Sequence, residues 1–508
     1  MLGLFSTQLV SRMLQRSVAQ QMSSLSFTAT TTTRPSGYMA DANASPMLRY
    51  QAFLPTLSIP TLQSTAAKYL VIIKPLLTPD AFTKTQKAVE RDVTEMIKRE
   101  GKQPYRRHTQ KQILYRTLVD ATSGRELSAA ELELQFNRII AVAEETPDVY
   151  PVWAPTSDLW TEARKDLVAV SPDGRNEECL KKIESAMIVV ALGDTKPVTR
   201  EDVIIVYDNG LSGFLGEHSC MDGTPTLRMN KFILATLASG KIDLGPSTVS
   251  DPSSLPEPQQ LTFRLNDTVK NHIASAAARF DAFVAKHDLN ILHYEGYGKN
   301  LMKHYKFSSD AWVQLVKQLG FHKLFGRPGV TYESVQTRKF LFGRTEVIRS
   351  ASNESKAWAE AMMDPSAWRD PLKLKDMFVK AASRHIQYSA WAADGQGVDR
   401  HLFGLKKMLK ESEDLPEIYK DPAFVKSGHW ELSTSQLSSK YFEDWGYGEV
   451  VEDGFGLSYA IGDDHVRRTI TNLKEKQKGA ELRHYLAEAT TEVRKMLEAA
   501  EKVEKGKL

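Results

Sequence analysis

One histidine lies in a segment of small residues that could carry acid–base chemistry. The segment from Gly213 to Pro225 reads G-F-L-G-E-H-S-C-M-D-G-T-P, and Asp222 follows His218 by one helical turn. Histidine has an unperturbed pKa near neutrality, so an oriented imidazole suits the removal of a proton from a hydroxyl or a thiol. The pattern predicts a general base for acyl transfer, although a lone histidine in a loop is more often structural.

Two neighbours of this histidine admit more than one role. Asp222 could favour the imidazolium and hold the ring, as the carboxylate of a catalytic triad does, or it could cap a helix or turn beside Gly223. Cys220 raises a cysteine nucleophile as a rival. We disfavour that rival because residues so close in sequence seldom point at one another.

Helices and strands alternate along the part of the chain that must position these residues. We predict strands at 187–192, 203–207 and 289–294 and helices at 267–287, 310–319 and 480–502. Asp310 falls in the first turn of the second of these helices, where a carboxylate suits the positive end of the helix dipole. The predicted fold class is therefore α/β.

Length and composition bound the class of protein. The chain has 508 residues, of which 42% are apolar and 25% charged, as in a globular protein of two or three domains. No run approaches the ~18 apolar residues that a membrane span needs, which leaves only peripheral membrane association open. A net charge of +3 gives no case for nucleic acid, and two cysteines exclude a disulfide framework. We expect no metal and no permanently bound cofactor.

Both ends of the chain carry patterns of targeting signals. Residues 1–46 are rich in hydroxyl residues and contain no acid before Asp41, which is typical of a mitochondrial transit peptide; a disordered tail is the alternative. The final three residues, Gly506 to Leu508, approximate a peroxisomal address. We therefore predict a mitochondrial protein with a peroxisomal form as a second destination.

Five blocks of sequence together resemble the choline/carnitine O-acyltransferase family, most of all its fungal-type carnitine acetyltransferases. They are the His218 loop, 298–310 (G-K-N-L-M-K-H-Y-K-F-S-S-D), 331–352 (T-Y-E-S … G-R-T-E-V-I-R-S-A-S), 398–406 (V-D-R-H-L-F-G-L-K) and 433–436 (S-T-S-Q). The resemblance implies two similarly built domains of the CoA-dependent acyltransferase type, with an active-site tunnel at their interface. We place the N-terminal domain, with the catalytic histidine loop, at 47–261 and the CoA- and carnitine-binding domain at 262–508.

The resemblance also implies roles for single residues. His218 would be the base, Asp222 its partner at a position where many family members have Glu, and Ser435 the group near the reacting carbonyl. The implied CoA contacts are Lys299, Lys303, Asp310 and Gln436, and the implied carnitine contacts are Tyr332, Ser334, Thr345, Arg400, Ser433 and Tyr447. By spacing alone, the lysine pair is one helical turn apart, which is more typical of a solvated face than of a binding site.

Two of the implied contacts bear on substrate choice. Carnitine carries a carboxylate that needs a cation, whereas choline does not, and Arg400 stands where the carnitine enzymes of the family have their carboxylate-binding arginine. The alternative for Arg400 is a structural ion pair with Asp399 or Glu431. Trp445 stands where a bulky residue blocks the channel for long chains, so the resemblance implies a short acyl group.

The chain departs from the family between about Lys98 and Tyr105, where a long segment that includes a carnitine-contacting tyrosine is absent. The first interpretation is an active carnitine O-acetyltransferase that uses acetyl-CoA and carnitine, with no nucleic acid. An inactive CoA- or carnitine-binding remnant is the alternative that the missing segment suggests. Choline O-acetyltransferase is the enzymatic runner-up.

Overall fold

The computed structural model describes residues 53–100, 128–145, 157–184, 189–192, 203–206, 212–216, 218, 222–240, 248–249, 251–255, 257–258, 260–410 and 412–506. The predicted transit peptide, Cys220, and the last two residues lie outside these ranges, as does most of 98–105, where we predict a departure from the family. Contacts divide the chain into one unit of residues 1–32 and 108–285 and a second of residues 33–107 and 286–508. This division differs from the predicted boundary at 261/262 in two places: residues 262–285 belong to the first unit, and residues 33–107 belong to the second.

Among its described residues, the first unit contains a three-stranded sheet and five α-helices. Its strands are β1 (Val189–Leu192), β2 (Val203–Val206) and β3 (Ser212–Leu215), and its helices are α5 (Ala129–Glu145), α6 (Ser157–Ala169), α7 (Arg175–Glu184), α8 (Gly223–Ser239) and α9 (Asp267–Lys286), with the short 3₁₀ helix η3 (Pro252–Ser254). β1 pairs in parallel with β2, and β2 pairs antiparallel with β3. Leu167, Leu180 and Val269 form a small core that joins α6, α7 and α9. The two strands and the helix predicted in this region are confirmed.

The second unit is built on a mixed six-stranded sheet in the order β4-β9-β8-β7-β5-β6. The strands are β4 (His287–Tyr294), β5 (Thr331–Gln336), β6 (Thr345–Ile348), β7 (Leu432–Gln436), β8 (Phe455–Ile461) and β9 (Val466–Leu473). β7 pairs in parallel with both β5 and β8, and the outer pairings are antiparallel. The predicted strand at 289–294 is confirmed and begins two residues earlier, as β4.

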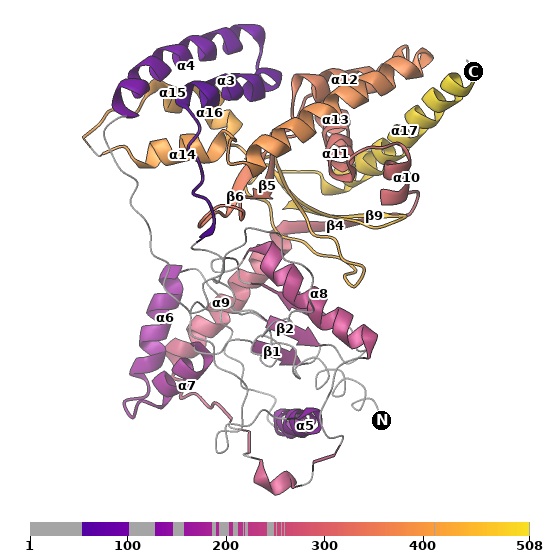
Figure 1. Ribbon diagram of the computed structural model, residues 1–508. Helices are drawn as coiled ribbons and strands as arrows, with labels where there is room; N and C mark the ends of the chain where they lie inside the picture. Colours follow the sequence, from indigo (N-terminus) through magenta and orange to yellow (C-terminus); the bar gives the residue numbers. More distant parts are fainter. Residues whose placement is uncertain are drawn as a thin grey trace. The chain divides into compact units, whose positions relative to one another are not determined.

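Ten α-helices accompany this sheet among the described residues (Figure 1). They are α3 (Leu62–Ile73), α4 (Pro79–Glu100), α10 (Lys299–His304), α11 (Ser309–Phe325), α12 (Asn353–Met363), α13 (Pro371–Ala393), α14 (Asp399–Lys407), α15 (Glu417–Lys420), α16 (Pro422–Ser427) and α17 (Gly479–Lys505), with the 3₁₀ helices η2 (Lys74–Leu76) and η4 (Ala367–Arg369). None of the described helices is both long enough and apolar enough to cross a bilayer.

Helices α11 and α17 cover one face of the six-stranded sheet. Phe321 of α11 and Leu486 of α17 share a core with Leu432, Leu457 and Ile470, which lie on three neighbouring strands. The Ser308 hydroxyl accepts from Ala311 N and so begins α11, and Gly326 ends it in the left-handed region at φ 66°. All side chains from residue 311 to residue 322 are buried, so this helix runs through the interior rather than over the surface.

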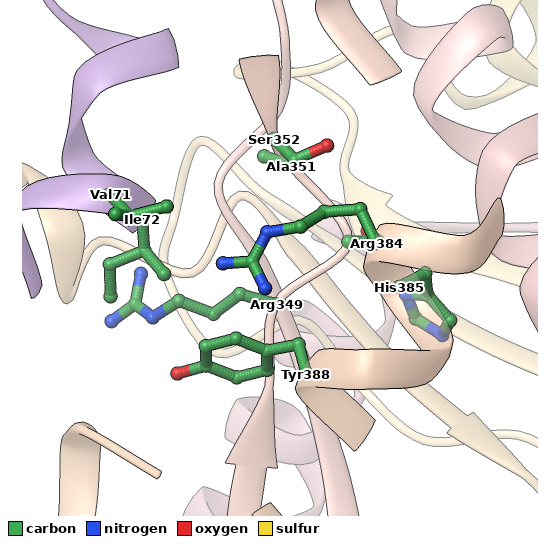
Figure 2. A pocket seen from close by; sticks show the side chains of 9 residues that line it. Val71, Ile72, Arg349, Ala351, Ser352, Arg384, His385 and Tyr388 are labelled. Carbon is green, nitrogen blue, oxygen red and sulfur yellow. The ribbon is translucent and has the colours of Figure 1, made fainter. Parts of the chain in front are cut away.

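A buried ion pair joins the end of β6 to α14. The Arg349 guanidinium donates to both carboxylate oxygens of Asp399, at 3.1 and 2.5 Å, and to Ser427 O at 2.8 Å. It also lies over the Trp430 ring, 4.6 Å from the centroid. Arg349 lines a small pocket together with Arg384, His385 and other residues (Figure 2). Because Asp399 is in the first turn of α14, this ion pair fixes the position of the next residue, Arg400.

We expect Asp399→Ala to lower the free energy of unfolding by about 3–5 kcal/mol, because it leaves the Arg349 guanidinium buried without its countercharge. Urea unfolding followed by circular dichroism measures the loss. The matched control is Asp394→Ala, which removes an exposed ion pair with Lys339 and should cost at most about 1 kcal/mol. Equal losses for the two variants would show that the buried pair is not required.

Candidate active site

Strand register places four of the predicted site residues on one face of the six-stranded sheet. Tyr332 of β5 is in register with Ser433 of β7, and Ser435 of β7 is in register with Ser458 of β8. Successive strand residues point to opposite faces, and Leu432 points to the face that α11 and α17 cover. Tyr332, Ser334, Ser433 and Ser435 therefore all point to the opposite face. Gln436 alternates with Ser435 and so lies on the other side of the sheet, at the exposed end of β7.

The connection from β7 to β8 contacts the same strands and carries two more predicted residues. The Tyr447 hydroxyl donates to Ser433 O at 2.9 Å, and Trp445 Nε1 donates to Tyr459 O at 3.3 Å. The Ser458 hydroxyl donates to the Trp445 carbonyl. The two aromatic rings lie 5.6 Å apart, centroid to centroid. Burial raises the pKa of the Tyr447 phenol, which therefore stays neutral.

Arg400 joins this group from α14. Its Nη2 lies 3.3 Å from both the Tyr332 hydroxyl and Thr345 Oγ1, and its Nε lies 3.3 Å from Thr345 O. Both rival partners are engaged elsewhere: Asp399 pairs with Arg349 and Glu431 pairs with Arg327. The guanidinium thus donates to neutral oxygens and remains exposed to solvent. A cation and two hydroxyls meet here, which is a suitable set for a carboxylate ligand.

Glu346 supports the start of α14 and was not singled out from the sequence. Its carboxylate accepts from Arg400 N at 3.2 and 3.3 Å and from Val347 N at 2.7 Å. Burial and the nearby charge of Asp399 raise the pKa of Glu346 to about 7. A Cβ at Gly397 would come within 2.4 Å of Glu346 Cγ, so this approach needs a glycine. Nothing in the local pattern distinguishes Glu346 from an exposed strand carboxylate.

The two predicted phosphate contacts lie on α10. Lys299 and Lys303 are one turn apart; Lys303 is exposed, and Lys299 pairs with Asp463 at 2.7 Å. Lys299 N and Asn300 N donate to Gly462 O and Asp463 O, each at 2.9 Å, which fastens the helix start to the turn between β8 and β9. A Cβ at Gly298 would lie 2.4 to 2.7 Å from backbone atoms of this turn, so the close approach needs a glycine. A phosphate bound here would replace Asp463 as the ion-pair partner of Lys299.

Asp310 lies at the edge of a mostly buried group rather than beside the two lysines, and 36% of its side chain is exposed. Its carboxylate accepts from His385 Nε2 at 3.2 Å and from the Tyr459 hydroxyl at 2.5 Å. Burial by itself would raise the pKa of Asp310, but these hydrogen bonds and the charges of His385 and Lys317 lower it overall. Oxygen and nitrogen atoms of Asp310, Glu333 and His385 lie within 4.8 Å of one another, which is close enough to consider a metal.

His218 and Asp222 belong to the first unit, whereas every other predicted site residue belongs to the second. His218 Nε2 lies 3.6 Å from Asp222 Oδ1, and the histidine side chain is 73% exposed. Asp222 is the N-cap of α8 and accepts from Gly223 N at 3.0 Å. The capping role considered for Asp222 is therefore present, and the same carboxylate oxygen is within ion-pair distance of the imidazole.

Comparison with known proteins identifies relatives along most of the chain. The model of the Choline/Carnitine o-acyltransferase family matches residues 109–488. The mitochondrial carnitine O-acetyltransferase of Saccharomyces cerevisiae is 34% identical over 418 residues, which are 76% of this chain and 61% of that protein. The carnitine O-acetyltransferase of Columba livia is 28% identical over 75% of this chain and 65% of its own length.

Human mitochondrial carnitine O-palmitoyltransferase 2 is 31% identical over 68% of this chain and 55% of its own length. The chain thus spans less than two thirds of the length of these three relatives. Relatives named for acetyl and for palmitoyl transfer both align with it. Since the family match covers most of its residues, from the helices before the His218 loop to α17, the chain belongs to the choline/carnitine O-acyltransferase family.

Proposed function

We propose that this protein is a carnitine O-acetyltransferase, which moves a short acyl group reversibly between CoA and carnitine. The observation that carries the proposal is the meeting of Arg400, Tyr332 and Thr345 at the edge of the sheet face that bears Ser433 and Ser435. A carboxylate held by the guanidinium and the two hydroxyls would place the rest of a small hydroxy acid over this face. Tyr447 offers an aromatic face to the trimethylammonium group.

The proposed reaction is a direct transfer with one base. The His218 imidazole takes the proton of the carnitine hydroxyl, whose oxygen attacks the thioester carbon. Ser435 stabilises the resulting oxyanion, the carbon–sulfur bond breaks, and the imidazolium returns its proton to the CoA thiolate. In the reverse direction His218 takes the proton of the thiol. Asp222 stabilises the imidazolium through its charge.

CoA would be held by residues of the second unit. Lys299 and Lys303 present two ammonium groups one helical turn apart, which suits a phosphate group. Asp310 and Gln436 are the proposed contacts for the rest of the CoA molecule. The support for these four residues is the family to which the chain belongs, together with the exposure of Lys303 and Gln436.

An inactive CoA- or carnitine-binding protein is the second candidate function. It is favoured by one observation, namely that the chain covers only 55% to 65% of the lengths of the three relatives described above. We also propose a mitochondrial location, supported by the composition of residues 1–46 and by the mitochondrial names of two relatives.

The first test is a thiol-release assay on the chain from Met47 onward with acetyl-CoA and L-carnitine, and with choline as the control alcohol. We expect carnitine-dependent release in the wild type and a loss of about 10²–10⁴ in kcat for His218→Ala, with CoA binding retained. A folded wild-type protein that binds CoA but releases no thiol would establish the second candidate. Substantial activity in His218→Ala would exclude this residue as the base.

Arg400→Asn should raise KM for carnitine by about 10- to 150-fold, because a charged hydrogen bond to a carboxylate contributes about 1.5–3 kcal/mol. Any slow reaction with choline should be unchanged, since choline has no carboxylate. Arg338→Asn is the matched control, because Arg338 is an exposed arginine that takes no part in the hydrogen bonds of this cluster. Unchanged carnitine kinetics in Arg400→Asn would remove this residue from the site.

Trp445→Gly should increase kcat/KM for palmitoyl-CoA relative to acetyl-CoA by at least about tenfold, because it removes the bulky ring that we propose as the limit on chain length. Trp445→Phe keeps a large ring and should retain the acetyl preference. Near-ultraviolet circular dichroism checks that both variants are folded. An unchanged ratio in the glycine variant would show that another residue sets acyl length.

A further inference from the structure

The covered face of the sheet holds ionisable groups directly behind the proposed substrate residues. Glu333 lies between Tyr332 and Ser334 on β5, and its side chain points to the face that α11 covers. Tyr459 of β8 points to the same face. Both are buried, with exposed fractions of 5% and 1%. The proposed reaction uses neither side chain.

The Tyr459 hydroxyl is at hydrogen-bond distance from two carboxyl groups, but it has only one proton to donate. Its oxygen lies 2.5 Å from Asp310 Oδ1 and 2.5 Å from Glu333 Oε1. A phenol donates one hydrogen bond and an ionised carboxylate donates none. Both contacts are hydrogen bonds only if one of the two carboxyl groups is protonated and donates to the phenol oxygen. Burial and the charge of Asp310 raise the pKa of Tyr459, so the phenol keeps its own proton.

The surroundings indicate which carboxyl group holds the proton. Asp310 accepts a second hydrogen bond from His385 and lies in the first turn of α11, where the helix dipole favours negative charge. Glu333 Oε2 is buried and has no hydrogen-bond partner among the described residues. A buried carboxylate with one hydrogen bond is costly, whereas a neutral acid leaves only a carbonyl oxygen unpaired. Burial and the charge of Asp310 raise the pKa of Glu333 to about 7, which also favours the neutral acid.

Two buried cations face this group and define the rival arrangement. Lys317 Nζ lies over the Tyr459 ring, 3.4 Å from the centroid, and it has no hydrogen-bond partner among the described residues. Arg468 of β9 is also buried, and burial lowers the pKa of Lys317 to about 7. In the rival arrangement Glu333 is ionised and balances Lys317. The same cations, and the phenol oxygen between the two carboxyl groups, disfavour a metal ion at Asp310, Glu333 and His385.

Hydrogen bonds connect Tyr459 to the strands that carry the substrate residues. Gln314 Nε2 lies 2.9 Å from Thr434 Oγ1 and 3.3 Å from the Tyr459 hydroxyl. Thr434 Oγ1 in turn donates to Tyr332 O at 2.9 Å. Thr434 separates Ser433 from Ser435, and Tyr332 is a partner of Arg400. A change at Tyr459 would therefore be transmitted both to Asp310 and to the proposed carnitine contacts.

We propose that Glu333 is held as the neutral acid and that Glu333 and Tyr459 are positioning residues, which fix Asp310 and strand β7 behind the substrate face. The kinetic part of this inference rests on the proposed function. The protonation of Glu333 does not, because it follows from the contacts of Tyr459 with the two carboxyl groups.

Glu333→Gln tests the protonation state, because an amide can donate to the Tyr459 oxygen as the neutral acid does. Between pH 4.5 and about 7 the unfolded chain releases a proton that folded Glu333 retains, so Glu333 lowers wild-type stability as pH rises. Glutamine does not titrate, so the Glu333→Gln variant does not lose this stability as pH rises. We therefore expect its urea midpoint to rise relative to that of the wild type between pH 5 and 7 and then to level off.

The matched control is Glu475→Gln, an exposed glutamate, whose midpoint should follow the wild type at every pH. Comparison with the wild type also cancels the contributions of groups whose pKa does not depend on Glu333, such as Glu346. If Glu333→Gln is less stable than the wild type by an amount that does not shrink between pH 5 and 8, Glu333 is ionised and the proposal is wrong. This measurement does not depend on enzymatic activity.

Kinetics test the positioning role in the thiol-release assay. Glu333→Gln should keep kcat and both KM values within about threefold of the wild type, whereas Tyr459→Phe should raise KM for acetyl-CoA or lower kcat by at least about tenfold. Wild-type kinetics in Tyr459→Phe would overturn the positioning role. If Tyr459→Phe does not fold, Glu333→Leu replaces it, because leucine cannot make the hydrogen bond to Tyr459. Wild-type kinetics in that variant would then overturn the positioning role. Absence of transfer in the wild type would contradict the proposed function and leave the stability test to decide the protonation of Glu333.

Discussion

The alternation of side chains along β5, β7 and β8 is the constraint on which the rest of the second unit depends. Each strand must present hydroxyl groups such as Ser433 and Ser435 on one face and must bury the residues between them on the other. The intervening residues include Glu333, Thr434 and Tyr459, so the covered face is polar just behind the proposed substrate residues. A buried polar group is stable only when it is hydrogen-bonded, which requires a matching partner on the covering helix.

Helix α11 supplies those partners. Gln314 donates toward Thr434 and Tyr459, and Gln318 donates to Gly329 O and Thr331 Oγ1. This explains why a helix that is buried from residue 311 to residue 322 contains glutamines, where a purely apolar sequence would otherwise be expected. Its apolar residues meet α17 and the far end of the sheet, with Gly320 allowing close approach to Leu486. One helix thus serves both as the core of the unit and as the support of the site.

Charge pairing distinguishes Arg400 from Arg349 and Arg327. Arg349 is satisfied by Asp399 and Arg327 by Glu431, each with two contacts to its carboxylate. Arg400 instead donates to hydroxyl and carbonyl oxygens, which leaves its charge without an ionised partner in these hydrogen bonds. A guanidinium in that state attracts an anionic group from solution more strongly than one already paired.

Local patterns in the sequence determined the elements. Ser308 caps α11 and the apolar spacing predicted its course, although the helix continues past the predicted end at residue 319 until Gly326 permits a left-handed turn. The five family blocks also indicated which residues to examine. The hydrogen bonds of Arg400 connect it with two others of these residues, Tyr332 and Thr345. Glu333, Tyr459 and Glu346 were missed, because each is an ordinary strand residue whose environment depends on partners far along the chain. Gln314 and Thr434, for example, are 120 residues apart. Capping and periodicity act between near neighbours, so sequence alone determines them, whereas burial and proton sharing arise only when the tertiary structure brings distant groups together.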